Sequence, residues 1–112
     1  MNTTNIHIIS IIMCLLAFCT ATPQAQAAPQ KRFTVVIDPG HGGHDPGAVG
    51  RRGKEKNINL SVALKLGKLI GSLEDTEVIY TRKNDRFVAL HERADIANKA
   101  KADLFISIHT NS

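Results

Sequence analysis

The sequence predicts an α/β domain, a three-layer structure with a parallel-type sheet and crossover helices. Three apolar runs rich in β-branched residues, at 33–37, 77–81 and 104–108, alternate with two stretches of helical periodicity, and no internal repeat is present. Parallel strands that are covered by helices on both faces are typically such continuous apolar runs. The order β-α-β-α-β would leave the last strand bare at a sheet edge, so we expect the domain to be truncated at its C-terminal side.

The first 27 residues have the pattern of a signal peptide. An apolar run, Ile8–Phe18, is followed by the small-x-small sequence Ala25–Ala27, and the run is shorter than the roughly 20 residues that span a bilayer. No Lys or Arg precedes the run, which departs from the usual pattern. An uncleaved anchor remains an alternative, as does lipid attachment at Cys19, which the bulky Phe18 before it disfavours.

Cleavage after Ala27 would leave residues 28–112 as the exported part, in the periplasm or the extracellular cell-wall compartment. The signal peptide would be its only connection to a membrane. Both cysteines would be removed, so this part could form no disulfide. Its acidic and basic residues are interleaved, and the formal net charge of the chain is +4. Such a charge mildly favours acidic partners, and the lack of a basic run indicates no nucleic-acid binding.

The first strand is predicted at Phe33–Ile37, and a Gly-rich loop follows it from Pro39 to about Lys54. The loop contains six of the eight glycines, namely Gly40, Gly42, Gly43, Gly47, Gly50 and Gly53. Glycine allows the backbone to approach a ligand closely, and loops between a strand and a helix that exceed about 2–6 residues tend to be functional. We therefore expect this loop to shape a binding site.

A helix is predicted after the loop, beginning near Glu55 and ending near Leu73. Its expected apolar stripe has spacings of three and four and consists of Ile58, Val62, Leu66, Leu69, Ile70 and Leu73.

The second half of the chain repeats this alternation. A strand at Glu77–Thr81 is followed by a polar connection over 82–86 and by a helix from Leu90 to about Lys101. Its expected apolar stripe is Leu90, Ala94, Ile96 and Ala97, and Ala89 is a weak N-terminal cap. The strand Leu104–Ile108 completes the pattern.

Three potential metal ligands are expected to converge at one edge of the sheet. His41 lies just past the first strand, His109 follows the third, and Glu55 opens the first helix. In open parallel sheets, ligands bind beyond the carboxyl ends of the strands. Two neutral imidazoles and a carboxylate form a recognised catalytic zinc set that leaves a fourth position for water, whose pKa the remaining positive charge can lower to roughly 7.

Each of these residues has a competing interpretation. His41 could be a solvated loop histidine, His109 could be satisfied by backbone hydrogen bonds, and Glu55 could only stabilise the helix dipole. His44 is a competing ligand because it lies three residues after His41, although we favour a solvated role for it. His91 is expected on the polar side of the second helix, exposed to solvent.

Several motifs in the same order carry a family resemblance. They are Val36-Ile-Asp-Pro-Gly-His-Gly-Gly43, Asp45-Pro-Gly-Ala48, Gly53-Lys-Glu-Lys-Asn57, Thr81-Arg82, Asp85, Leu90, Arg93, Ala97-Asn98, Ala102-Asp103 and Ser107-Ile-His-Thr-Asn111. In these residues the chain resembles the zinc-dependent N-acetylmuramoyl-L-alanine amidases, which are peptidoglycan amidases of the amidase_3 type with an α/β catalytic domain. The resemblance covers nearly all of Phe33–Ser112.

The resemblance implies that His41, Glu55 and His109 bind Zn²⁺ as cofactor, and that residues 28–112 are the N-terminal portion of the catalytic domain. It implies peptidoglycan as the partner and hydrolysis of the amide bond between N-acetylmuramic acid and L-alanine. The family's general-base glutamate comes from a later strand, so we expect it beyond Ser112, and no catalytic or substrate-binding residue is assigned here. The sequence is also compatible with regulation of the protein by a protein activator.

Two other functional classes remain as alternatives. A non-catalytic zinc-containing cell-wall-binding module would share the metal site without the hydrolysis. Anion or nucleotide binding by the Gly-rich loop is disfavoured, because Lys54 is not followed by Ser or Thr as in phosphate-binding loops.

Three further polar residues are assigned mainly structural roles. Asp38 and Asn111 could orient ligands or water, yet Asp38 could equally fix the Pro39 turn and Asn111 could cap a loop. Arg93 is expected to tie the second helix to the sheet.

Overall fold

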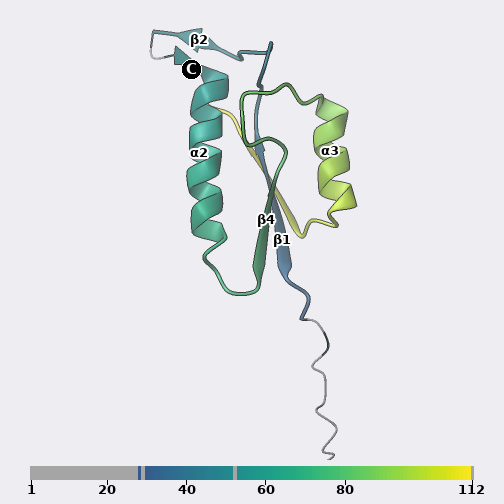
Figure 1. Cartoon of the computed structure of the whole chain (residues 1–112). Helices are drawn as coiled ribbons and strands as arrows, with labels where there is room; N and C mark the ends of the chain where they lie inside the picture. Colours follow the sequence, from purple (N-terminus) through teal and green to yellow (C-terminus); the bar gives the residue numbers. More distant parts are fainter. Residues whose placement is uncertain (1–27, 29, 52, 112) are drawn as a thin grey trace, which may run out of the picture.

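The computed structural model describes residues 28, 30–51 and 53–111, and the expected signal peptide lies outside this part of the chain. The elements in order are β1 (Phe33–Pro39), β2 (Val49–Gly50), β3 (Gly53–Lys54), α2 (Glu55–Ile70), β4 (Thr76–Tyr80), α3 (Leu90–Lys99) and β5 (Leu104–Ile108). Figure 1 shows how they are arranged. Within the described residues, neither helix has the length and apolarity needed to cross a membrane.

The main sheet has three parallel strands in the order β4-β1-β5. In the register, Val35 of β1 lies opposite Val78 of β4 and Leu104 of β5. The central strand is buried from its second residue onward, as expected for a strand with neighbours on both sides and helices on both faces. The predicted parallel sheet is confirmed.

Helices α2 and α3 cover opposite faces of the sheet, which gives the expected three layers (Figure 1). On the α2 side, Val35 and Ile37 of β1 pack with Ala63 of α2 to form the core. Partly buried apolar residues surround them, namely Leu66, Ile70, Val78, Tyr80, Ile106 and Ile108. On the other side, the buried Arg93 of α3 contacts Asp38 of β1.

The predicted apolar stripe of the first helix is only partly right: Leu66 and Ile70 pack against the core, but the fully buried face has other residues. Small and polar residues form the buried face of α2, which is made of Glu55, Lys56, Asn59, Ala63 and Gly67. By contrast, Val62 and Leu69 are 43 % and 69 % exposed. The physical reason is close packing, because a Cβ atom on Gly67 would overlap the hydroxyl group of Tyr80. Only small side chains allow α2 to lie this near to the sheet.

The stripe predicted for the second helix is also partly wrong. Leu90 is 87 % exposed and Ala94 is exposed, whereas Ile96 and Ala97 are half-buried as expected. The buried residue of α3 is Arg93, because its guanidinium group reaches the polar end of β1. Hydrogen bonding rather than apolar packing therefore fixes this helix face.

Element bounds differ from the sequence prediction by a few residues. β1 continues two residues further to Pro39, α2 ends at Ile70 rather than near Leu73, and α3 ends at Lys99. β4 begins and ends one residue earlier than expected, and β5 has the predicted bounds. As expected, β5 lies at an edge of the sheet, and its Leu104 and Phe105 are 45 % and 42 % exposed.

The Gly-rich loop contains a short antiparallel hairpin that the sequence did not reveal. Its strands β2 and β3 pair Val49 with Lys54 and Gly50 with Gly53. Space is open around both glycines, since a Cβ atom on either would meet nothing within 4 Å. The hairpin leads directly into Glu55 and so determines where α2 begins.

Candidate metal centre

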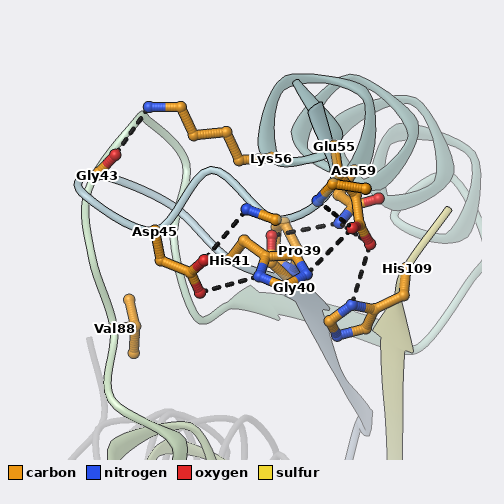
Figure 2. Close-up of polar contacts among 12 residues, drawn as sticks. Pro39, Gly40, His41, Gly43, Asp45, Glu55, Lys56, Asn59, Val88 and His109 are labelled. Atoms are coloured by element: carbon orange, nitrogen blue, oxygen red, sulfur yellow. Dashed lines mark hydrogen bonds and ion pairs between the residues drawn. The ribbon is translucent and has the colours of Figure 1, made fainter. Parts of the chain in front are cut away.

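Two histidines and a glutamate from three elements meet at the carboxyl ends of the strands. His41 follows β1, His109 follows β5, and Glu55 is the first residue of α2. Each offers one ligand atom, and these three atoms lie within 4.8 Å of one another. In Figure 2, dashed lines join the Glu55 carboxylate to a ring nitrogen of each histidine. The structure thus brings together the three residues that the sequence singled out.

Each carboxylate oxygen of Glu55 faces one histidine. Nε2 of His41 lies 3.3 Å from Oε2, and Nδ1 of His109 lies 3.3 Å from Oε1. The two rings are nearly perpendicular, with their centroids 4.9 Å apart. Nitrogen and oxygen donors at these separations fit a single small cation, because zinc binds imidazole nitrogen and carboxylate oxygen at about 2.0–2.2 Å.

Backbone N–H groups keep Glu55 ionised although its side chain is only 3 % exposed. The N–H of Ala48 donates to Oε2 at 3.0 Å, and those of Thr110 and Asn111 donate to Oε1 at 3.2 and 3.3 Å. The pKa of Glu55 is lowered to about 2, chiefly by the Ala48 hydrogen bond and against the opposing effect of burial. The site therefore contains a buried negative charge beside two imidazoles.

The outer nitrogen of His41 has a carboxylate partner of its own. Nδ1 lies 2.9 Å from Oδ2 of Asp45, while Oδ1 of Asp45 accepts the N–H of Gly47 at 3.1 Å. The pKa of Asp45 is lowered, first by the hydrogen bond to His41 and then by that from Gly47. The sequence analysis assigned no role to Asp45, because the contact forms only when the loop folds back on itself through the backbone pairing of Gly42 with Asp45.

Two buried arginines hold the backbone that carries His41. Arg82 donates to the carbonyls of Pro39 and Gly40, both at 2.9 Å, and Arg93 donates to those of Pro39 and His41 at 2.9 and 3.0 Å. His41 itself has φ of 61°, a conformation that is uncommon for residues other than glycine. These charged donors fix the loop where its backbone turns. Arg82 was also missed by the sequence analysis, because its partners are main-chain carbonyls.

Asp38 joins three elements rather than fixing the Pro39 turn. Its carboxylate accepts hydrogen bonds from Thr81, Arg93 and Ser107 at 2.6, 2.6 and 2.8 Å. The structural interpretation of Arg93 is confirmed, since it ties α3 to the end of β1. Asn111 contributes its main-chain N–H to Glu55.

The other two histidines of this part of the chain lie outside the cluster. His44 is exposed and its ring stacks on Phe87, with centroids 4.1 Å apart. His91 is exposed on α3, as expected. A solvated His44 agrees with the preferred interpretation, while the stacking on Phe87 was not predicted.

The two histidines are more accessible than the glutamate. Their side chains are 23 % exposed for His41 and 41 % for His109, whereas Glu55 lies beneath them. A cavity of about 820 Å³ adjoins the rings on the α3 side, and Phe87, Leu90 and Phe105 contribute its apolar walls. A ligand can therefore approach the centre from the histidine side.

Comparisons with known proteins place this chain in a family. A model of the amidase_3 family, described as N-acetylmuramoyl-L-alanine amidase, matches residues 35–112. A putative N-acetylmuramoyl-L-alanine amidase of Buchnera aphidicola subsp. Acyrthosiphon pisum is 48 % identical over 83 residues, which are 73 % of this chain and 35 % of the relative. The amidase AmiA of Escherichia coli K12 is 43 % identical over 90 residues, or 80 % of this chain and 30 % of the relative.

Solved structures show the same fold. An N-acetylmuramoyl-L-alanine amidase from Clostridium difficile 630 superposes with a TM-score of 0.70 at 40 % identity, covering 72 % of this chain and 45 % of the other. The catalytic domain of CwlV from Bacillus (Paenibacillus) polymyxa var. colistinus gives 0.68 at 45 % identity, with 70 % and 45 % covered. The chain thus spans less than half the length of each of these relatives. From the family match and these likenesses together, the chain belongs to the N-acetylmuramoyl-L-alanine amidase family.

Proposed function

We propose that the protein acts in zinc-dependent hydrolysis of the amide bond between N-acetylmuramic acid and L-alanine in peptidoglycan. The single observation that carries the proposal is the convergence of His41, Glu55 and His109 at the carboxyl edge of the sheet. The names of the relatives support the reaction, and the donor atoms support the metal.

The donor set suits Zn²⁺. Two neutral imidazoles and one carboxylate are a known catalytic zinc set, with a fourth position left open. When bound, zinc supplies Lewis-acid chemistry, by which a carbonyl is polarised and a water molecule becomes acidic near neutral pH. The single negative charge of Glu55 neutralises only part of a divalent charge, so the centre keeps the positive charge that this chemistry needs.

The residues around the centre have separate tasks in this proposal. Glu55 and the two histidines hold the ion, and the main-chain N–H groups on Glu55 keep its carboxylate charged and oriented. The exposed side of His41 and His109 is where the scissile amide approaches. A second carboxylate must transfer the proton to the leaving amine. We assign none of the described residues to that step.

We propose further that residues 28–112 are the N-terminal portion of the amidase catalytic domain, and that residues 1–27 direct export to the periplasm or cell wall. The 45 % coverage of the solved relatives supports the first part, and the apolar pattern of the N-terminus supports the second. Peptidoglycan is the proposed partner. A protein activator could also bind beside the exposed side of His41 and His109.

The test is an assay on purified peptidoglycan with the full-length chain and Zn²⁺. We expect stem peptides with a free L-alanine amino group to be released slowly, and no release by Glu55→Gln or with a chelator. The Clostridium difficile amidase serves as the positive control. Sedimentation of the zinc-loaded chain with the wall and no peptide release at any concentration would contradict hydrolysis and favour the non-catalytic wall-binding module.

A further inference from the structure

Only one of the two ring nitrogens of His41 faces the metal centre. Nε2 lies 3.3 Å from Oε2 of Glu55, whereas Nδ1 points away from Glu55 and lies 2.9 Å from Oδ2 of Asp45 (Figure 2). A neutral imidazole carries its hydrogen on one nitrogen, and the hydrogen-bond partner decides which one. The contact with Asp45 is the shorter of the two and has hydrogen-bond geometry, so it favours the hydrogen on Nδ1 of His41 and a free lone pair on Nε2.

Asp45 is held in place independently of His41. Its backbone N–H and C=O both pair with Gly42, at 3.1 and 2.9 Å, and its Oδ1 accepts the N–H of Gly47 at 3.1 Å. These contacts leave Oδ2 directed at His41. Because an ionised carboxylate only accepts hydrogen bonds, Nδ1 of His41 must be the donor in this contact.

We propose that Asp45 is a positioning residue for the metal centre: its carboxylate holds the hydrogen of His41 on Nδ1 and so leaves the Nε2 lone pair free for Zn²⁺. This inference rests on the proposed function, because it takes His41 as a zinc ligand. Carboxylates in this position fix the orientation of a ligating imidazole and increase its basicity. Their loss typically lowers metal affinity by about 10–100-fold.

The variant Asp45→Asn separates this role from a role in folding the loop. The amide oxygen can still accept the N–H of Gly47, and the NH₂ group then faces Nδ1 of His41. A donor at that place favours the hydrogen on Nε2, where it blocks the lone pair. Asp85→Asn is the matched control, since Asp85 accepts the loop N–H of Gly43 at 2.8 Å and pairs with Lys56 rather than with His41.

The test uses the full-length chain freed of metal, with Zn²⁺ alone as the ligand. Competition with a chromophoric chelator should give an affinity about 10–100-fold lower for Asp45→Asn and a change within about threefold for Asp85→Asn. Long-range ¹H–¹⁵N spectra of the histidine rings provide a second readout. They should show a hydrogen on Nδ1 of His41 in the wild-type chain and on Nε2 alone in Asp45→Asn.

Two results would overturn the inference: a wild-type His41 with its hydrogen on Nε2 alone, or an Asp45→Asn chain with wild-type zinc affinity. A failure of the proposed function would give a different result. The wild-type chain would then bind no zinc, but its spectrum would still show the hydrogen on Nδ1 of His41. If the Asp45→Asn chain does not fold, the wild-type spectrum alone decides.

Discussion

Gly40 lies directly against the imidazole ring of His109. A Cβ atom at position 40 would lie 2.7 Å from Nδ1 of His109 and closer still to two other ring atoms. The absence of a side chain at Gly40 is therefore a condition for His109 to face Glu55. The Gly-rich loop therefore shapes the centre in two ways. It leaves space for the ring of His109 at Gly40, and it carries the candidate ligand His41.

Replacing Gly40 by alanine should displace His109 and weaken zinc binding by about tenfold or more, because a metal site tolerates only about 0.5 Å of ligand displacement. His109 is 41 % exposed, so its ring can swing outward without unfolding the domain. Gly50→Ala is the matched control, since nothing lies within 4 Å of a Cβ atom there. Chelator competition measures both affinities, and equal values for the two variants would refute the steric argument.

Removing either imidazole of the centre should abolish tight zinc binding. We expect His41→Ala and His109→Ala to bind no stoichiometric zinc after dialysis, because two protein ligands hold the ion too weakly. His44→Ala should keep wild-type zinc content, since its ring stacks on Phe87 outside the cluster. Elemental analysis of the three variants decides the ligand set. A full zinc complement in the His109 variant would show that the assignment is wrong.

Removing the guanidinium group of Arg93 should destabilise the domain strongly. Arg93→Met leaves the buried carboxylate of Asp38 without its charged partner, and breaking a buried pair in this way costs about 3–5 kcal/mol. Arg32→Met is the control: its side chain is 61 % exposed and pairs with the exposed Glu77, so the expected loss is below about 1 kcal/mol. Urea unfolding measures both, and similar losses would speak against the role of Arg93.

The metal-free chain should lose stability in acid partly through Glu55. Its pKa is about 2 in the folded chain against an ordinary 4.5, so between these values the unfolded chain binds more protons than the folded one. The stabilisation by Glu55 is thus complete above pH 4.5 and is lost as the pH falls to about 2. Urea unfolding with a chelator present should show a weaker acid dependence for Glu55→Gln. Parallel pH profiles for the two chains would contradict this expectation.

The sequence was sufficient to predict the strands and the layers. Apolar β-branched runs identify β1, β4 and β5 because parallel strands are buried on both faces. The buried face of α2 was not predictable in the same way, because hydrophobic periodicity assumes that large apolar residues mark the contact surface. In α2 the most deeply buried contacts with the sheet are made by Ala63 and Gly67, whose small size allows close approach to Tyr80, while the large Leu66 and Ile70 are only partly buried.

His41, Glu55 and His109 could be predicted as ligands from the sequence, because the order of strands and helices places all three at the carboxyl edge of the sheet. The surrounding contacts depend instead on how the loop folds. Asp45 reaches His41 only through the backbone pairing with Gly42, and Arg82 binds main-chain carbonyls that carry no sequence signal. Metal binding by His41, Glu55 and His109 stays a prediction that the geometry supports.

X-ray absorption at the zinc edge of the loaded full-length chain tests the central claim most directly. The account predicts one zinc ion with two imidazole nitrogens and light oxygen ligands at about 2.0–2.2 Å, since His41, His109 and Glu55 supply these donors. A spectrum without the multiple scattering of two imidazole rings would contradict it.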